Sequence, residues 1–220
     1  MKHNYYNIHT HKKPQINNEV CIRNAYLTPI ERFEPSYFLS TGIHPWHVMR
    51  ISAKELMNRL EKNCKNKQVK AIGEIGLDKF ATDYERQKSY FDMQINFAAQ
   101  GHYPVILHQV KSVEGVGSVT KDFNEPIILH GFNGHISVWE QLNRKGKTYI
   151  SIGSNCLNPS TKLLQTLKEI PINNLFLETD NAAVLVQTVY EKIASIRQIE
   201  TSILMEEMAI NFKSVFKTAI

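Results

Sequence analysis

The sequence predicts an α/β fold, a (β/α) barrel formed by a single domain over residues 1–220. Short apolar runs typical of β-strands alternate along the chain with segments that carry helix signals. This alternation indicates a parallel sheet that is buried on both faces. Side chains able to bind metal follow the ends of most of these runs, which favours a closed barrel over a doubly wound open sheet.

About seven strands are expected. The first, at residues 5–8, is weakly marked. The others are the apolar, β-prone runs at residues 37–40, 69–72, 104–107, 126–129, 148–152 and 174–177. An eighth strand is not evident, so the barrel is expected to be abbreviated at its C-terminal end.

Capping residues mark the expected starts of three helices, and the tail over residues 186–217 is helical in composition. A helix N-terminus leaves backbone N–H groups without partners, which the side chains of Ser, Thr, Asp and Asn can satisfy. The three starts are Ser52 with Glu55, Thr82 with Glu85, and Asn158 before Pro159.

Composition is that of an ordinary globular protein, with 42% apolar and 21% charged residues. No apolar run is long enough to span a membrane and no signal-peptide pattern is present, so we expect a cytoplasmic protein, with a monomer favoured. The cysteines Cys21, Cys64 and Cys156 are far apart, which argues against a disulfide framework or a zinc knuckle. The formal net charge of +5 permits a nucleic-acid partner without requiring one.

Residues with strong ligand chemistry end five of the expected strands. They are His9 and His11, Glu74, His108, His130 and Asp180. In a parallel barrel these strand ends meet at one face, where active sites are built. Any of these residues alone has a common structural explanation, such as a helix cap for Asp180. Four imidazoles with two carboxylates at equivalent positions instead suit one or two divalent ions such as Zn²⁺, Mg²⁺ or Mn²⁺.

Two further residues are candidate substrate contacts. His44, in Gly42-Ile43-His44-Pro45, follows the second strand and is expected to face the same pocket, where it can contact a substrate phosphate. Lys111 lies three residues after His108 and is a second candidate phosphate contact, whereas Trp46 is expected to pack rather than to stack on a base.

Taken in order, these motifs resemble the TatD family of metal-dependent deoxyribonucleases, of which the chain looks like a short member. The match runs from His9 to about Asp180, and Arg86-Gln87 with Gln94 resemble the family's glutamine-bearing helix. The motifs read His9-Thr10-His11, Gly42-Ile43-His44-Pro45, Gly73-Glu74-Ile75-Gly76-Leu77-Asp78, Val105-Ile106-Leu107-His108, His130-Gly131-Phe132-Asn133-Gly134 and Glu178-Thr179-Asp180.

The resemblance implies a TIM-type barrel of the metallo-dependent hydrolase superfamily with two divalent ions. One ion would be held by His9, His11 and Asp180, and the second by His108 and His130, with Glu74 bridging the two. Asp180 would also orient or deprotonate the attacking water, so Glu74 and Asp180 are the implied catalytic residues. The implied reaction is hydrolysis of a phosphodiester, as in 3′-to-5′ trimming of DNA.

Two alternatives stay open. One is an amidohydrolase-like enzyme that acts on a small ester, amide or lactone; Glu74 at the bridging position, where the common binuclear form has a lysine, favours the phosphodiesterase. The other is a degenerate relative that binds metal and nucleic acid without cleaving it. Asn7 keeps this second alternative open, because the family commonly has an aspartate there that supports the metal ligands.

Overall fold

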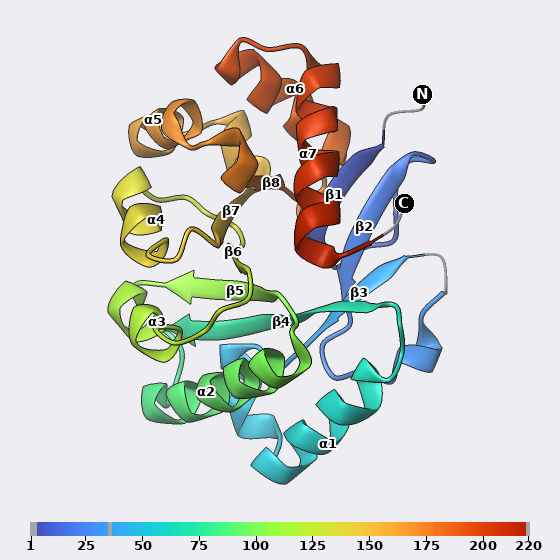
Figure 1. Cartoon of the computed structure of the whole chain (residues 1–220), viewed down its shortest axis with the longest axis vertical. Coiled ribbons are helices and arrows are strands. Elements are labelled where there is room, and N and C mark those ends of the chain that lie inside the picture. The colour runs from blue at the N-terminus through green and yellow to red at the C-terminus, as the bar shows by residue number, and fades with distance from the viewer. Residues whose placement is uncertain (1–3, 35–36, 219–220) are drawn as a thin grey trace. The chain divides into compact units, whose positions relative to one another are not determined.

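The computed structural model describes residues 4–34 and 37–218 (Figure 1). Contacts within the chain divide it into two compact units. The terminal unit combines Met1–Arg23 with Leu129–Ile220, and the central unit is Asn24–Ile128. The single domain expected from the sequence stays a prediction.

In the terminal unit, parallel strands alternate with helices. Its elements are β1 (Tyr5–Thr10), β2 (Glu19–Asn24), β6 (Ile127–Leu129), α4 (Ile136–Leu142), β7 (Thr148–Ile152), η3 (Ser154–Leu157), α5 (Thr161–Glu169), η4 (Ile172–Asn174), β8 (Leu175–Leu177), α6 (Val186–Arg197) and α7 (Thr201–Phe216), with β2 and β6 reaching across its boundary. Strand β1 pairs with β2, and β7 pairs with β8. An isolated parallel bridge joins Thr10, the last residue of β1, to Asp180, which follows β8. The ends of β1 and β8 therefore lie together.

The two C-terminal helices, α6 and α7, bind strands β1 and β8 through buried hydrogen bonds. The buried Tyr190 of α6 accepts a hydrogen bond from the backbone N–H of Tyr6 at 2.8 Å and donates one to its carbonyl at 2.9 Å. The Asn211 side chain of α7 donates to the carbonyl of Leu175 at 2.9 Å. These contacts satisfy polar groups that would otherwise be buried without partners, and they fix β1 and β8 against the helices.

The central unit has the same alternation. Its elements are η1 (Ile30–Arg32), β3 (Phe38–Thr41), η2 (Pro45–Arg50), α1 (Ala53–Cys64), β4 (Val69–Asp78), α2 (Tyr84–Gly101), β5 (Val105–Val110) and α3 (Val113–Val119). Strands β3, β4 and β5 pair in parallel. Helix α2 holds the end of β4, because the buried Gln87 side chain bonds both the N–H and the C=O of Asp78 at 2.9 and 3.1 Å.

Several predicted elements are corrected. The strand missing from the prediction is β2, not one at the C-terminal end, so the barrel is not abbreviated there: β8 is followed by α6 and α7. Charged Glu19 and Arg23 interrupt the apolar run of β2, which hid it from a pattern search. The tail helix is divided at Gln198, which adopts a left-handed backbone conformation after α6.

Two of the three helix starts also differ from those predicted. Ser52 caps α1 as expected, with its Oγ accepting from the N–H of Glu55 at 3.2 Å. Helix α2 is capped by Asp83 instead of Thr82, and α5 by Ser160 instead of Asn158. In each case the nearer capping side chain reaches the free N–H group three residues on. No helix in residues 4–34 and 37–218 combines the length and apolar character needed to cross a membrane.

Candidate metal centre

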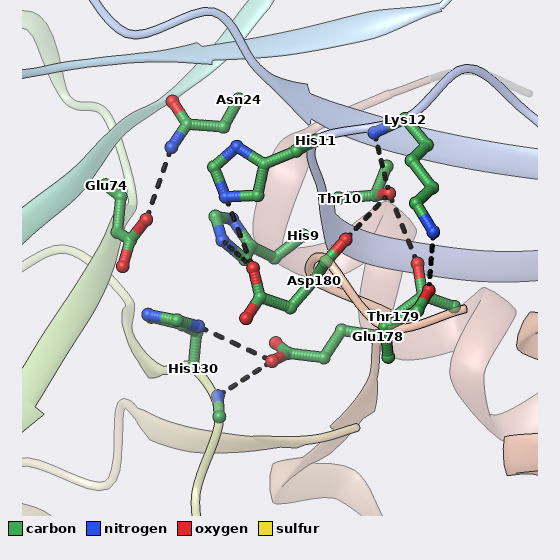
Figure 2. A network of polar contacts seen from close by, with 12 residues as sticks. His9, Thr10, His11, Lys12, Asn24, Glu74, His130, Glu178, Thr179 and Asp180 are labelled. Carbon is green, nitrogen blue, oxygen red and sulfur yellow. Dashed lines mark hydrogen bonds and ion pairs between the residues drawn. The ribbon is translucent and has the colours of Figure 1, made fainter. Parts of the chain in front are cut away.

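A carboxylate lies between two imidazoles at the joined ends of β1 and β8 (Figure 2). The Oδ1 atom of Asp180 is 3.2 Å from Nε2 of His11 and 3.6 Å from Nε2 of His9. One ligand atom of each residue can be chosen so that all three lie within 4.8 Å of one another. The spacing of two residues on an extended strand end directs both imidazoles to this place, as the sequence predicted.

Backbone contacts hold the Asp180 carboxylate there. The N–H of Asp180 donates to the carbonyl of His9 at 3.0 Å, and its own carbonyl accepts from the N–H of His11 at 3.3 Å. Asp180 has φ +50°, in the left-handed region that aspartate enters more readily than most residues. This turn directs the side chain back toward β1.

The electrostatics of this cluster favour an ionised carboxylate. Burial by itself would raise the pKa of Asp180, but the hydrogen bond with His11 and the nearby His9 and His130 outweigh it, so the pKa lies below its usual value of 3.8. The Asp180 side chain is still 44% exposed. The site thus presents an ionised oxygen that solvent can reach.

His130, which follows β6, has a carboxylate behind it that sequence analysis did not single out. Its Nδ1 lies 3.4 Å from Oε1 of the fully buried Glu178, which also accepts from the N–H of Gly131 at 2.8 Å. The other carboxylate oxygen, Oε2, has no hydrogen-bond partner among the described residues. A carboxylate on Nδ1 fixes the tautomer of a histidine and leaves Nε2 as the ligand atom. The sequence did carry a signal for this carboxylate, because Glu178 is the first residue of the motif Glu178-Thr179-Asp180.

Asn7 supports the same segment. Its Oδ1 accepts from the N–H of Thr179 at 3.1 Å, and its Nδ2 donates to Thr179 Oγ1 at 2.9 Å and to Glu19 Oε1 at 2.7 Å. Asn7 is buried, so these contacts are shielded from water. An amide suits this position because one partner is an acidic side chain, and Asn7 positions the residue before Asp180.

The central unit contains a second carboxylate between two imidazoles. Oε1 of Glu74 in β4 lies 3.3 Å from Nε2 of His44 and 3.1 Å from Nδ1 of His108 in β5. The three ligand atoms lie within 4.8 Å of one another. The other oxygen of Glu74 accepts a hydrogen bond from Asn24 at 3.3 Å (Figure 2).

Asp78, at the end of β4, holds the far side of His108. Its Oδ2 lies 3.2 Å from Nε2 of His108 and accepts from the indole N–H of Trp46 at 2.7 Å, while Oδ1 accepts from the N–H of Phe80 at 2.8 Å. Burial would raise the pKa of Asp78, but these contacts outweigh it and lower the pKa. Both ring nitrogens of His108 thus face a carboxylate oxygen. In the tautomer that donates from Nε2 to Asp78, Nδ1 presents a lone pair beside Glu74, as a metal ligand must.

Trp46 packs only in part, since its ring meets that of His44 edge to face with centroids 4.9 Å apart. Trp46 is 61% exposed and is held through its indole N–H rather than by burial of its ring. Its neighbour His44 starts the 3₁₀ helix η2 and accepts from the N–H of Trp46 at 3.1 Å, which fixes the imidazole toward Glu74. A proline after His44 favours this helix start, and the sequence indicated it only as part of a motif.

The structure thus brings most of the predicted residues into two sets. The terminal unit contains His9, His11, His130 and Asp180, and the central unit contains Glu74 and His108 together with His44. The predicted sharing of one ion by His108 and His130, and the bridging by Glu74, involve both units and stay predictions. Lys111 is exposed and follows β5 with φ +51°; its contact with substrate also stays a prediction.

Comparison with known proteins gives the family. A family model described as TatD related DNase matches residues 15–217. The chain belongs to the TatD related DNase family. It is 31% identical over 158 residues to the uncharacterized metal-dependent hydrolase YjjV of Escherichia coli (strain K12), covering 68% of this chain and 60% of YjjV. It is 30% identical over 158 residues to the 3′-5′ ssDNA/RNA exonuclease TatD of Pantoea sp. (strain At-9b), covering 69% of this chain and 60% of that protein.

A solved structure confirms the predicted fold. The crystal structure of the TatD homologue YjjV from Escherichia coli K12 superimposes with a TM-score of 0.80 at 22% identity, covering 91% of this chain and 87% of that chain. This TatD-family chain therefore has the TIM-type (β/α) barrel fold. In sequence it spans about 60% of the length of the relatives YjjV and TatD.

Proposed function

We propose that this TatD-family chain is a metal-dependent nuclease that hydrolyses phosphodiester bonds in DNA with two divalent ions and trims the strand from its 3′ end. The observation that carries the proposal is the repeated arrangement of one carboxylate between two imidazoles, in each of the two units. Asp180 lies between His9 and His11, and Glu74 lies between His44 and His108. The Pantoea relative, named a 3′-5′ ssDNA/RNA exonuclease, supports the direction of trimming.

The side chains present fit divalent ions. Imidazole nitrogens and carboxylate oxygens are the usual ligands of Zn²⁺, and carboxylates also suit Mg²⁺ and Mn²⁺. His9, His11 and Asp180 would hold one ion, and their ligand atoms lie within 4.8 Å of one another. The resemblance to the family assigns the second ion to His108 and His130, with Glu74 shared. The buried Oε2 of Glu178 adds unneutralised acceptor capacity beside His130. Bound ions supply Lewis acidity, which polarises a phosphate and makes water nucleophilic near neutral pH.

Asp180 then has a defined task. Because its pKa is lowered, the carboxylate is ionised at neutral pH and is a weak base, so it orients the attacking water through a hydrogen bond better than it removes the proton outright. Its 44% exposed side chain can meet water from solvent. His9 and His11, held by the backbone bonds between β1 and Asp180, keep this oxygen in place.

The remaining residues position ligands and substrate. Glu178 and Asp78 fix the tautomers of His130 and His108, so that Nε2 of the first and Nδ1 of the second stay available. His44 is a contact for substrate phosphate or a further ligand, since its Nε2 already faces Glu74. Lys111 is a second phosphate contact through an exposed ammonium group.

The test is hydrolysis of a single-stranded DNA oligonucleotide labelled at its 5′ end. Metal-stripped protein is assayed with Mg²⁺, Mn²⁺ or Zn²⁺ restored, beside Glu74→Gln and the matched control Glu140→Gln, which alters an exposed glutamate of α4. We expect metal-dependent shortening from the 3′ end in wild type and in Glu140→Gln, and none in Glu74→Gln. A phosphorothioate at the last 3′ linkage should delay it.

Other outcomes would select the alternatives. Hydrolysis of lactones, amides or small esters without cleavage of DNA would make the chain an amidohydrolase-like enzyme. Binding of the oligonucleotide without cleavage under any metal would make it a nucleic-acid-binding relative. Equal shortening by wild type and Glu74→Gln would remove Glu74 from the machinery.

A further inference from the structure

A groove with a basic rim lies in the central unit, between the segment after β2 and the start of α1. We call it the basic groove. Its main cavity has a volume of 330 Å³ and is lined by Tyr26, Leu27, Thr28, Pro29, Arg32, Gly42, Ile43, His47, Arg50, Ile51, Glu55 and Arg59. A second cavity of 390 Å³ shares four of these residues and adds Lys62 and Asn63. Volumes of about 300 Å³ and above are those of small-ligand sites.

The charge of the groove is positive and only partly neutralised. Three guanidinium groups line the main cavity, from Arg32, Arg50 and Arg59, against one carboxylate, that of Glu55. Glu55 pairs with Arg59 one helical turn away. Within the part of the chain that the structure describes, Arg32 and Arg50 make no ion pair, and both are exposed. Two guanidinium groups are thus available to an anion.

The walls offer flat and apolar surface beside these charges. The rings of Tyr26 and His47 meet edge to face with centroids 5.9 Å apart. Leu27, Ile43 and Ile51 line the groove and belong to one buried apolar cluster with Leu56 and Leu60. Such a surface suits a planar, partly apolar group such as a nucleobase.

Buried amides hold the walls in place. Gln94 bonds both the N–H and the C=O of Ile43, at 2.7 and 3.3 Å. Asn63 donates to the carbonyl of Thr28 at 3.2 Å. The guanidinium group of Arg86 also donates to the carbonyls of Val48 and Ile51 at 3.0 and 3.2 Å. These bonds fix the backbone before and after Arg50. The groove is therefore preformed, which reduces the entropy that a ligand must lose on binding.

The groove shares backbone segments with the Glu74 cluster. The Asn24 side chain donates to Glu74 at 3.3 Å and accepts from the N–H of Tyr26, a wall residue, at 2.9 Å. His44 follows Ile43 directly and lies 3.3 Å from Glu74. A strand bound at Glu74 can therefore continue into the groove over a short path along these two segments.

We propose that the basic groove binds the nucleotide next to the one being cleaved, with Arg32 and Arg50 on its phosphate and its base against Tyr26 and His47. This inference rests on the proposed nuclease function. Guanidinium groups match phosphate oxygens with paired N–H donors, and stacking on aromatic rings tolerates any base. The groove therefore retains single-stranded DNA without reading its sequence.

The test is binding without catalysis. A fluorescent single-stranded pentanucleotide is titrated with protein in EDTA, and its anisotropy is followed at several salt concentrations. For the double variant Arg32→Gln/Arg50→Gln we expect affinity about a hundredfold weaker, since two contacts to a charged group are lost and each contributes about 1.5 kcal/mol. The slope of log K against log salt should fall by about 0.7, because the two arginines neutralise one phosphate and each phosphate neutralised on a single strand contributes about 0.7.

Two controls make the result specific. Arg144→Gln removes an exposed arginine of the terminal unit and should bind as wild type does, whereas Arg32→Lys/Arg50→Lys should keep the salt slope. Equal affinity and slope for wild type and the glutamine double variant would overturn the proposal, as would an equal loss in Arg144→Gln. Failure of the nuclease proposal is seen separately, when wild type with metal hydrolyses neither the pentanucleotide nor bis(4-nitrophenyl) phosphate.

Discussion

Replacing Asp78 by asparagine should weaken metal binding through His108 without removing any ligand. The Asp78 carboxylate accepts hydrogen bonds on both oxygens: Oδ2 meets Trp46 at 2.7 Å and His108 at 3.2 Å, and Oδ1 meets Phe80 at 2.8 Å. An asparagine must turn its NH₂ group toward one of these sides. In one orientation the NH₂ group faces the N–H of Phe80, and two donors meet. In the other orientation the NH₂ group faces the indole N–H of Trp46 and Nε2 of His108, so His108 must carry its proton on Nδ1 instead.

The expected magnitude follows from these contacts. With the proton on Nδ1, His108 no longer presents a lone pair beside Glu74. Loss of such a carboxylate behind a histidine ligand costs about 10- to 100-fold in metal affinity, or roughly 1.4–2.7 kcal/mol. Because Asp78 is buried, the misplaced donor should also lower the free energy of unfolding by about 1–3 kcal/mol.

Calorimetric titration of the metal-free protein with Zn²⁺ or Mn²⁺ measures the first effect, and urea denaturation measures the second. Asp122→Asn is the matched control, since it alters an aspartate whose side chain is 89% exposed in the same unit. Reduced stability with metal affinity within twofold of wild type would refute the proposed positioning of His108.

Three other changes have defined outcomes. Asn7→Asp should lower the free energy of unfolding by about 1–3 kcal/mol in urea denaturation, because it sets a carboxylate against Glu19; adding Glu19→Gln should restore part of the loss. Gly76→Ala should destabilise the protein by at least about 1 kcal/mol in the same assay, since its Cβ would lie 2.1 Å from the carbonyl oxygen of His108 at φ +138°. The pKa of Asp180 is lower in the folded protein than its usual value of 3.8. Its carboxylate therefore stabilises the fold fully above pH 3.8, and this contribution is lost as the pH falls below 3.8 and through the folded-state pKa. Acid titration of the metal-free protein should therefore show a smaller loss of stability below pH 3.8 for Asp180→Asn than for wild type.

The candidate metal residues could be predicted from the sequence because each one follows an apolar, β-prone run. His9, Glu74, His108 and Asp180 are recognisable together from this placement, since parallel strands of a barrel present their carboxyl ends at one face. The strands themselves are longer than the apolar runs indicated, because β4 continues through Glu74 to Asp78 and β5 through His108 to Val110. Strand β2 could not be found in the same way, because charged side chains break its apolar run and no helix precedes it.

Residues that act through another residue were harder to predict. Asp78 and Glu178 lie within recognised motifs, but their role depends on which histidine nitrogen they face, and that is set by contacts between segments distant in sequence. The exposed ring of Trp46 and the open side chain of Arg50 depend on how η2 is held against α2. Periodicity within one segment carries no information on such contacts.

The most direct measurement is a metal titration in which bound ions and DNA hydrolysis are followed in the same sample. Metal-free protein receives increasing Mn²⁺ or Zn²⁺, and ions per chain are compared with the rate of shortening of a single-stranded oligonucleotide. We predict that hydrolysis rises as ions bind, saturates at two per chain, and is abolished when His11→Ala or His108→Ala removes one of them. Full metal loading without hydrolysis, or undiminished hydrolysis in both variants, would contradict the proposed two-metal nuclease.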